Sequence, residues 1–156
     1  MITQSELKEL LNYNQDTGIF TWIKTGKVAG GYLTSGYKRI GVKNKSYLYH
    51  RLAWLYVYGK FTKDTIDHIN GNKSDNRISN LREATFVENK QNSKKSNKNT
   101  SGSKNVVWNK NCKKWQVQIW LNRKSKYIGV FNDFEFASFV ADEVRDIYHK
   151  EFARIQ

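Results

Sequence analysis

The sequence predicts an α+β protein made of two small units, for three reasons. Short β-rich segments separated by glycines occur together with helical patterns in residues 1–92. Residues 93–103 contain no apolar side chain and are rich in lysine, which is typical of a basic linker. Further strand and helix patterns follow in residues 104–156. A chain of 156 residues is long enough for two such domains.

The N-terminal region predicts a helix, then hairpins, then a second helix. Thr3-Gln4-Ser5-Glu6 has the form of a capping box, and the leucines that follow recur at helical spacing. A turn is expected at residues 14–18. Glycine-separated β-rich pieces between residues 19 and 49 predict small antiparallel hairpins. Residues 50–58 are apolar and aromatic and predict a buried helix.

The C-terminal region predicts three strands and one helix. The strands are expected over residues 106–108, 115–121 and 126–131, and the helix over residues 133–150. The periodicity of the helix predicts a buried stripe, formed by Phe136, Val140, Val144 and Ile147.

The composition indicates a polyanionic partner. The formal net charge is +13, and basic side chains exceed acidic ones in both halves of the chain.

No apolar run approaches the roughly 20 residues that span a bilayer, and no signal-peptide pattern opens the chain, so we expect an intracellular protein that does not enter the membrane. With Cys112 as the single cysteine and three histidines, a Cys/His zinc cluster is excluded.

Residues 66–89 carry the strongest chemical signal. Asp67 and His68 are adjacent on a predicted extended element, so their side chains diverge, and one can hold a cation while the other meets a water. Thr85-Phe86-Val87-Glu88 has the form of a second capping box, which places Asn89 in the first turn of a helix. Asp67 and Asn89 can then share a divalent ion, Mg²⁺ or Mn²⁺, which needs few protein ligands. His68 is the candidate general base.

A simpler interpretation competes with this one. An Asx-rich turn that joins two strands, with His68 as a core histidine, would explain an isolated Asp-His pair. Several positions in register and a capped helix favour the catalytic interpretation. For His50, which stands among apolar residues of a predicted buried helix, the structural interpretation is preferred, and we leave it out of the catalytic set.

The Asp-His pair, Asn80 and Asn89 together resemble the HNH nucleases in their His-Asn-Asn form, as in phage intron-encoded homing endonucleases. His50-Arg51-Leu52-Ala53-Trp54 and the loop Asn-Gly-Asn-x-x-Asp-Asn-Arg look like the same group. The resemblance implies a ββα-metal fold, with Asp67 and Asn89 as metal ligands and His68 as general base. It implies that Asn80 braces the loop and orients the histidine. It also implies 5′-phosphate and 3′-hydroxyl ends.

The C-terminal strands predict a second DNA-binding surface. Alternation over residues 115–120 places Gln116, Gln118 and Trp120 on one exposed face, followed by Arg123, Lys124 and Lys126. The C-terminal region, residues 102–155, resembles the AP2 DNA-binding domain at Trp108, Trp115-Gln-Val-Gln-Ile, Tyr127-Ile128-Gly129-Val130-Phe131 and Glu151-Phe152-Ala153-Arg154. Asn105 stands where that family usually has glycine. The resemblance implies DNA contacts by Lys104, Asn109, Gln116, Gln118, Trp120, Lys124 and Tyr127. A basic sheet without base specificity is the alternative.

The sequence therefore predicts a metal-dependent endonuclease that binds double-stranded DNA, acts as a monomer and nicks a selected site. The resemblance implies a phage-encoded protein of the host-cell cytoplasm. A non-catalytic DNA-binding regulator on the same scaffold is the first alternative, and it would bind DNA in Mg²⁺ without cutting. An RNA-binding protein is the second, and competition between duplex DNA and RNA separates it from the others.

Overall fold

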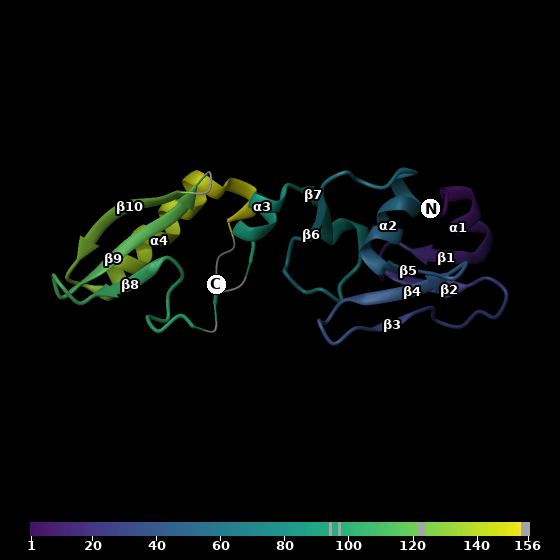
Figure 1. Ribbon diagram of the computed structural model, residues 1–156, viewed down its shortest axis with the longest axis horizontal. Coiled ribbons are helices and arrows are strands. Elements are labelled where there is room, and N and C mark those ends of the chain that lie inside the picture. The colour runs from purple at the N-terminus through teal and green to yellow at the C-terminus, as the bar shows by residue number, and fades with distance from the viewer. Residues whose placement is uncertain (94, 97, 122–123, 154–156) are drawn as a thin grey trace. The chain divides into compact units, whose positions relative to one another are not determined.

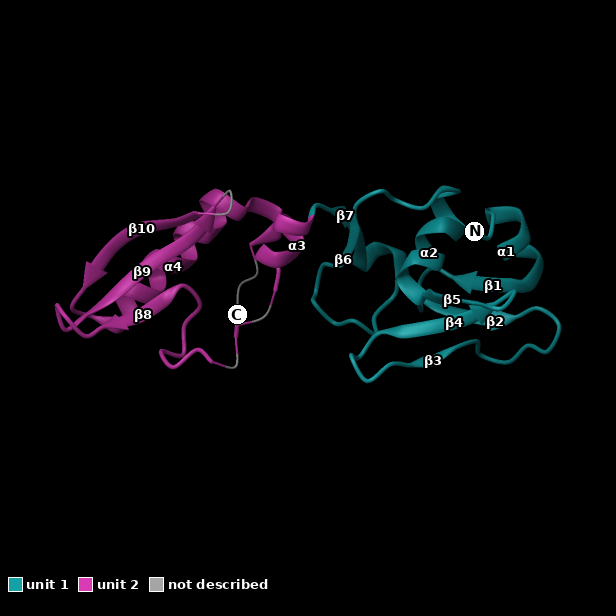
Figure 2. Ribbon diagram, viewed as in Figure 1, with its two compact units in different colours: residues 1–85 teal, residues 86–156 magenta. Residues whose placement is uncertain are grey.

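A computed structural model describes residues 1–93, 95–96, 98–121 and 124–153, and its chain forms two compact units, Met1–Thr85 and Phe86–Gln156 (Figure 2). The described residues form small antiparallel sheets and four α-helices (Figure 1). The predicted α+β class is confirmed. The positions of the units relative to one another are not determined. The sequence-based limits at residues 92 and 103 stay predictions.

The first unit begins with α1 (Gln4–Leu10), which starts at the predicted capping box. Thr3 accepts a hydrogen bond from the Glu6 backbone, and the Glu6 carboxylate accepts one from the Thr3 backbone. A two-stranded hairpin follows, β1 (Leu11–Asn14) and β2 (Ile19–Trp22). The helix and the hairpin bury Leu7, Leu11 and Phe20 completely.

A three-stranded sheet and a helix complete the core of this unit. The sheet has the order β3 (Gly31–Tyr32), β4 (Lys38–Val42), β5 (Lys45–Leu48). The helix α2 (Tyr49–Tyr58) follows β5 directly and ends at Gly59, whose φ of +75° is a conformation that glycine adopts without strain. Ile40, Tyr49 and Leu52 are fully buried in the same core. The predicted helix at residues 50–58 is confirmed.

The last elements of the first unit are β6 (Thr65–His68), the short 3₁₀ helix η1 (Ile78–Asn80) and β7 (Leu81–Ala84). β6 and β7 pair antiparallel. Their apolar members Ile66 and Leu81 belong to the core cluster, which anchors the hairpin on the unit. The polar residues at the loop end of β6 are therefore carried by a rigid base.

The second unit contains α3 (Phe86–Gln91), three strands and a long helix. The strands β8 (Val106–Asn109), β9 (Lys114–Leu121) and β10 (Lys124–Phe131) form an antiparallel sheet with β9 in the centre. The helix α4 (Phe134–His149) packs on this sheet and continues as η2 (Lys150–Phe152). The predicted three strands and one helix are confirmed.

The predicted buried stripe of α4 is wrong. Phe136 and Ile147 are exposed, while Val140 and Val144 are only partly buried. The buried face is instead Ala137, Ala141, Arg145 and His149. Small side chains let the helix lie close to Val106 and Val117 of the sheet, and Arg145 is satisfied by the Lys104 carbonyl.

The polar stretch before β8 is ordered by hydrogen bonds. The Ser101 hydroxyl donates to the Val106 carbonyl at 2.6 Å, and the Asn99 amide donates to the Ser103 carbonyl at 2.8 Å. Ser103 is buried and accepts a hydrogen bond from Ser138 of α4. Polar contacts therefore order residues 99–103, which have no apolar side chain to bury, and the basic linker at residues 93–103 stays a prediction.

Candidate functional site

The end of β6 carries the predicted catalytic pair. Asp67 lies opposite Arg82 in the strand register, and His68 lies opposite Leu81. Asp67 and His68 are each 4% exposed. Their side chains make separate contacts, as expected for neighbours on an extended strand. The pair is therefore held in place on both sides of the strand.

Asp67 forms an ion pair with Arg82 across the hairpin. The Arg82 Nε and Nη2 atoms donate to Asp67 Oδ2 at 3.1 and 3.0 Å. Both side chains are largely buried, so the pair is shielded from solvent. The sequence prediction did not include Arg82, because a strand register across a loop of this length cannot be fixed from the sequence.

His68 is oriented by Asn76. His68 Nε2 lies 3.3 Å from Asn76 Oδ1, and the Asn76 amide nitrogen donates to the Ser74 carbonyl at 2.9 Å. The second bond fixes the amide so that its oxygen faces the ring. His68 Nε2 is then the donor, and Nδ1 keeps the basic lone pair. Burial lowers the pKa of His68, while the hydrogen bond to Asn76 opposes the shift, so the ring is neutral at neutral pH.

Asn80 closes the loop between β6 and β7. Its side-chain oxygen accepts from the Asn70 backbone at 3.0 Å, and its amide donates to the Asn70 side chain and to the Asp75 carbonyl. These contacts hold the two ends of the loop together, and the role that the resemblance implies for Asn80 stays a prediction. The amide oxygen that faces the His68 ring belongs to Asn76, which accepts the hydrogen bond from His68 Nε2. Asn76 is 1% exposed, and the only signal for it in the sequence was its place in the Asx-rich loop.

The first hairpin supports this loop from outside. The Tyr13 hydroxyl donates to the Asn76 carbonyl at 2.6 Å. Gly18, in the turn between β1 and β2, lies against the backbone of Asn76 and Arg77, where an added Cβ would come within 2.4 Å of the Arg77 nitrogen. The position of Asn76, and through it the His68 ring, thus depends on β1 and β2.

His50 and Tyr37 pack beside His68. The His50 and His68 rings are nearly perpendicular, at 82°, with centroids 5.0 Å apart. The Tyr37 ring lies 5.4 Å from that of His50 and 6.0 Å from that of His68. His50 is 6% exposed, and its Nδ1 is enclosed without a hydrogen-bond partner. His50, for which the sequence favours a structural role, therefore packs directly against the candidate base.

The donors at this site suit a hard divalent cation. Asp67 supplies a carboxylate, the ligand that Mg²⁺ and Mn²⁺ prefer. The described residues contain no cluster of three or more His, Cys, Asp or Glu side chains that could enclose a metal. A site that uses few protein ligands and completes its shell with water and phosphate fits this arrangement. Asn89 lies on α3 in the other unit, so its assignment as the second ligand comes from the sequence alone.

The exposed face of the second sheet carries a row of side-chain amides. The Asn109 amide donates to Gln116 Oε1 at 2.8 Å, and Gln116 donates to Gln118 Oε1 at 3.1 Å. Tyr127 lies opposite Gln118 in the register. Trp120, on the same strand and face as the glutamines, is 61% exposed. The predicted alternation of β9 is confirmed, since Val117 and Ile119 are buried on the other face.

Two of the predicted DNA contacts, Lys104 and Lys124, do not belong to this row of amides. Lys124 is opposite Leu121, so it belongs to the side of the sheet that carries Val117 and Ile119. Arg123 lies outside the described residues. The Lys104 ammonium donates to the carbonyls of Gln91 and Ser93, both at 2.8 Å.

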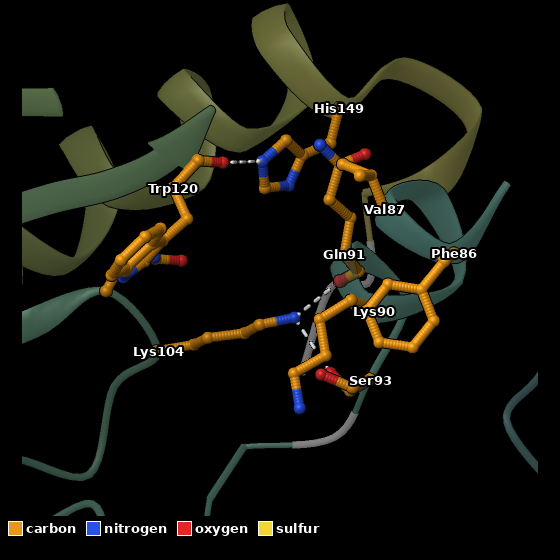
Figure 3. A pocket seen from close by; sticks show the side chains of 9 residues that line it. Phe86, Val87, Lys90, Gln91, Ser93, Lys104, Trp120 and His149 are labelled. Carbon is orange, nitrogen blue, oxygen red and sulfur yellow. Dashed lines mark hydrogen bonds between the residues drawn. The ribbon is translucent and has the colours of Figure 1, made fainter. Parts of the chain in front are cut away.

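Lys104 also lines a cavity of about 640 Å³ within the second unit (Figure 3). Its other walls include Phe86, Trp120 and His149, and Figure 3 shows the His149 ring turned toward the Trp120 carbonyl, at 3.4 Å. Asn105, at the position where a glycine was expected, has a φ of +69°. Asparagine tolerates this conformation better than most residues, so the turn into β8 keeps the backbone that glycine would give.

Residues 47–91 match the family model of an HNH endonuclease. Protein 3.8 of Escherichia phage T7 is 31% identical over 108 residues, which cover 69% of this chain and 88% of that protein. A solved structure of the HNH homing endonuclease I-HmuI, titled for its DNA binding and cleavage, is 31% identical with a TM-score of 0.46. That match covers 53% of this chain and 51% of the solved chain, so the chain spans about half of its length. Within the described residues, no helix is both long and apolar enough to cross a membrane.

Proposed function

Because the chain belongs to the protein family of Protein 3.8 of Escherichia phage T7, and its residues 47–91 form an HNH endonuclease domain, we propose that it is a metal-dependent endonuclease that hydrolyses phosphodiester bonds of duplex DNA. The observation that carries the proposal is the Asp67-His68 pair on β6, with a neutral imidazole fixed by Asn76 beside a buried carboxylate. Both residues fall within the matched family segment.

In the proposed reaction, His68 is the general base. Its Nδ1 takes a proton from the attacking water while the water oxygen bonds to phosphorus. The bond from phosphorus to the 3′ oxygen breaks, and this oxygen takes up a proton from solvent. The products are a 5′-phosphate and a 3′-hydroxyl. Asn76 holds the other side of the ring, so the base is oriented before the substrate arrives.

Asp67 and Asn89 are the proposed ligands of Mg²⁺ or Mn²⁺. When bound, such an ion supplies charge stabilisation for the phosphate and the departing oxygen. Arg82 shares the Asp67 carboxylate and keeps it in place. Asn80 braces the loop that carries Asn76, and its role in catalysis is therefore indirect.

The second unit is proposed to select the DNA site. The amide row of Asn109, Gln116 and Gln118 offers donors and acceptors of the kind that pair with base edges in a major groove, and Trp120 and Tyr127 flank it. On this basis we propose that the second unit is a DNA-binding domain of the AP2 type. Lys104, whose ammonium is held by two backbone carbonyls, and Lys124, on the other side of the sheet, do not belong to this amide row. With one centre per chain, a monomer is proposed to nick one strand.

Supercoiled plasmid and phage genomic DNA, incubated with the wild type or His68→Ala in Mg²⁺, Mn²⁺ or EDTA, test the proposal. We expect open circles or discrete fragments with the wild type, none in EDTA, and a rate about 10²–10⁴-fold lower with His68→Ala. Sealing of the nicks by DNA ligase checks the 5′-phosphate and 3′-hydroxyl. DNA that is shifted in a gel but intact under every metal condition would favour the non-catalytic regulator.

A further inference from the structure

The stability of the fold does not explain why a histidine occupies the buried position 50. The His50 ring is 6% exposed, and Nδ1 has no hydrogen-bond partner and no contact with solvent. Leaving a buried polar atom unsatisfied costs about 1–3 kcal/mol. An apolar side chain in the same place would avoid this cost. Conflicts of this kind are expected where a residue is kept for function.

The contact that His50 makes is with the proposed base. The two rings meet nearly at right angles, 5.0 Å between centroids, and Tyr37 packs against both. Tyr37 is itself covered by Lys73, whose ammonium lies 4.7 Å from the ring centroid. Burial lowers the pKa of His50 to about 3, with His68 and Arg51 adding to the shift, so the ring is uncharged at neutral pH.

The support behind His50 is rigid. It belongs to the first turn of α2, and its helix neighbours Tyr49, Leu52 and Ala53 are completely buried. The Tyr49 hydroxyl accepts a hydrogen bond from the Phe20 backbone at 2.7 Å. The His50 ring therefore forms a fixed packing surface for the His68 ring, while Asn76 Oδ1 holds the same ring by accepting a hydrogen bond from Nε2.

We propose that His50 is a positioning residue of the reaction centre: it holds the His68 ring in the orientation in which Nε2 faces Asn76. This inference rests on the proposed nuclease function. If His50 has only a structural role, a substitution should lower the cleavage rate only when it also lowers the free energy of unfolding. If His50 positions His68, a substitution should lower the cleavage rate even when the fold stays stable. Replacing His50 by an apolar side chain should leave the fold as stable as before or more stable, and should still slow cleavage.

The test compares His50→Phe and His50→Leu with the wild type. The leucine variant guards against overpacking by the larger ring. We expect an unchanged or higher free energy of unfolding in urea, unchanged DNA binding in EDTA, and a kcat at least about 10-fold lower. Trp54→Phe is the matched control, because Trp54 lies one turn along α2 and its Nε1 is also enclosed without a partner. It should change stability without changing kcat.

A double-mutant cycle shows whether His50 acts through His68. In a His68→Ala background, His50→Leu should cause no further loss of rate. A kcat within twofold of the wild type, or an equal loss in both backgrounds, would overturn the inference.

If the wild type cuts no DNA, the nuclease proposal fails separately. The NMR signals of the His68 ring then decide on positioning, since the chain has three histidines to assign: unchanged His68 shifts in His50→Leu would refute it.

Discussion

At the scale of single residues, the ion pair between Asp67 and Arg82 determines how the stability of the protein responds to a divalent cation. Without metal, the Asp67 carboxylate is neutralised by Arg82, and both groups are largely buried. Removing one partner of a buried pair leaves an uncompensated charge, which typically costs about 3–5 kcal/mol. We expect Arg82→Met to unfold at lower temperature than the wild type in EDTA. Mg²⁺ or Mn²⁺ should restore part of that loss, because a bound cation would replace the positive charge that the Asp67 carboxylate loses with Arg82.

Thermal unfolding with and without divalent ions measures this effect. Arg77→Met is the control, since Arg77 pairs with Asp75 at a site where the arginine is 49% exposed. Solvent screens such surface pairs, so little change in stability is expected. Adding Asp67→Ala to Arg82→Met should abolish the response to metal. Equal stabilisation of both arginine variants by metal would argue against Asp67 as a cation ligand.

At the scale of elements, the turn of the first hairpin controls the loop that carries Asn76. Gly18 has a φ of +67°, and a Cβ there would meet the Asn76 carbonyl carbon at 2.5 Å and the Arg77 nitrogen at 2.4 Å. Gly18→Ala therefore adds a clash with backbone to the strain of a left-handed conformation. We expect it to lower both the free energy of unfolding in urea and the rate of DNA cleavage.

Gly26→Ala separates the two effects. Gly26 has nearly the same φ, +68°, but an added Cβ would meet nothing within 4 Å. This variant should cost about 1–2 kcal/mol from backbone strain alone and cut DNA at the wild-type rate. If both alanine variants cut equally well, the hairpin does not position Asn76 as described.

Elements were predicted from the sequence more successfully than contacts. Capping boxes, glycine breaks and the apolar run at residues 50–58 predicted most elements, because these signals are local. The partners of the site, Arg82 and Asn76, were missed, because they depend on strand register and loop closure. The α4 stripe was misassigned, because alanines pack closely without a strong hydrophobic signal.

At the scale of the whole molecule, three buried histidines make the fold sensitive to acid. Burial lowers the pKa of His50 from 6.5 to about 3, and lowers those of His68 and His149 as well. Between pH 6.5 and 3 the unfolded chain binds more protons at His50 than the folded chain, so stability is complete above pH 6.5 and falls below it. At pH 5.5 the loss from His50 alone is on the order of 1 kcal/mol.

Urea unfolding at pH 7.5 and 5.5 checks this expectation. The free energy of unfolding should fall in the wild type and fall less in His50→Leu, which lacks one of the three groups. The carboxylates with lowered pKa values, Glu6 and Asp75, add their effect only in stronger acid, because their ordinary values lie near 4. A wild-type stability that is the same at both pH values would contradict neutral burial of these histidines.

Binding and cutting are expected to be separable, because the amide row lies on the sheet of the second unit whereas Asp67 and His68 lie on β6 of the first unit. Gln118→Ala and Trp120→Ala change the exposed face of β9 and leave β6 untouched. Each should weaken binding to the preferred DNA by about 10-fold or more, and kcat at saturating DNA should stay unchanged. Phe139→Ala, which removes an exposed aromatic ring from α4, is the control and should bind normally.

The same variants distinguish a sheet that reads bases from one that only contacts phosphates. With a net charge of +13, binding will weaken steeply with salt in either case, so affinity alone does not decide. A reading sheet loses affinity for the preferred site while its binding to unrelated duplexes stays nearly constant. A phosphate-binding sheet loses both equally. Equilibrium binding to matched and unrelated duplexes at several salt concentrations would therefore reveal whether the amide row contributes site selection to the nuclease, and an equal loss on both duplexes would exclude it.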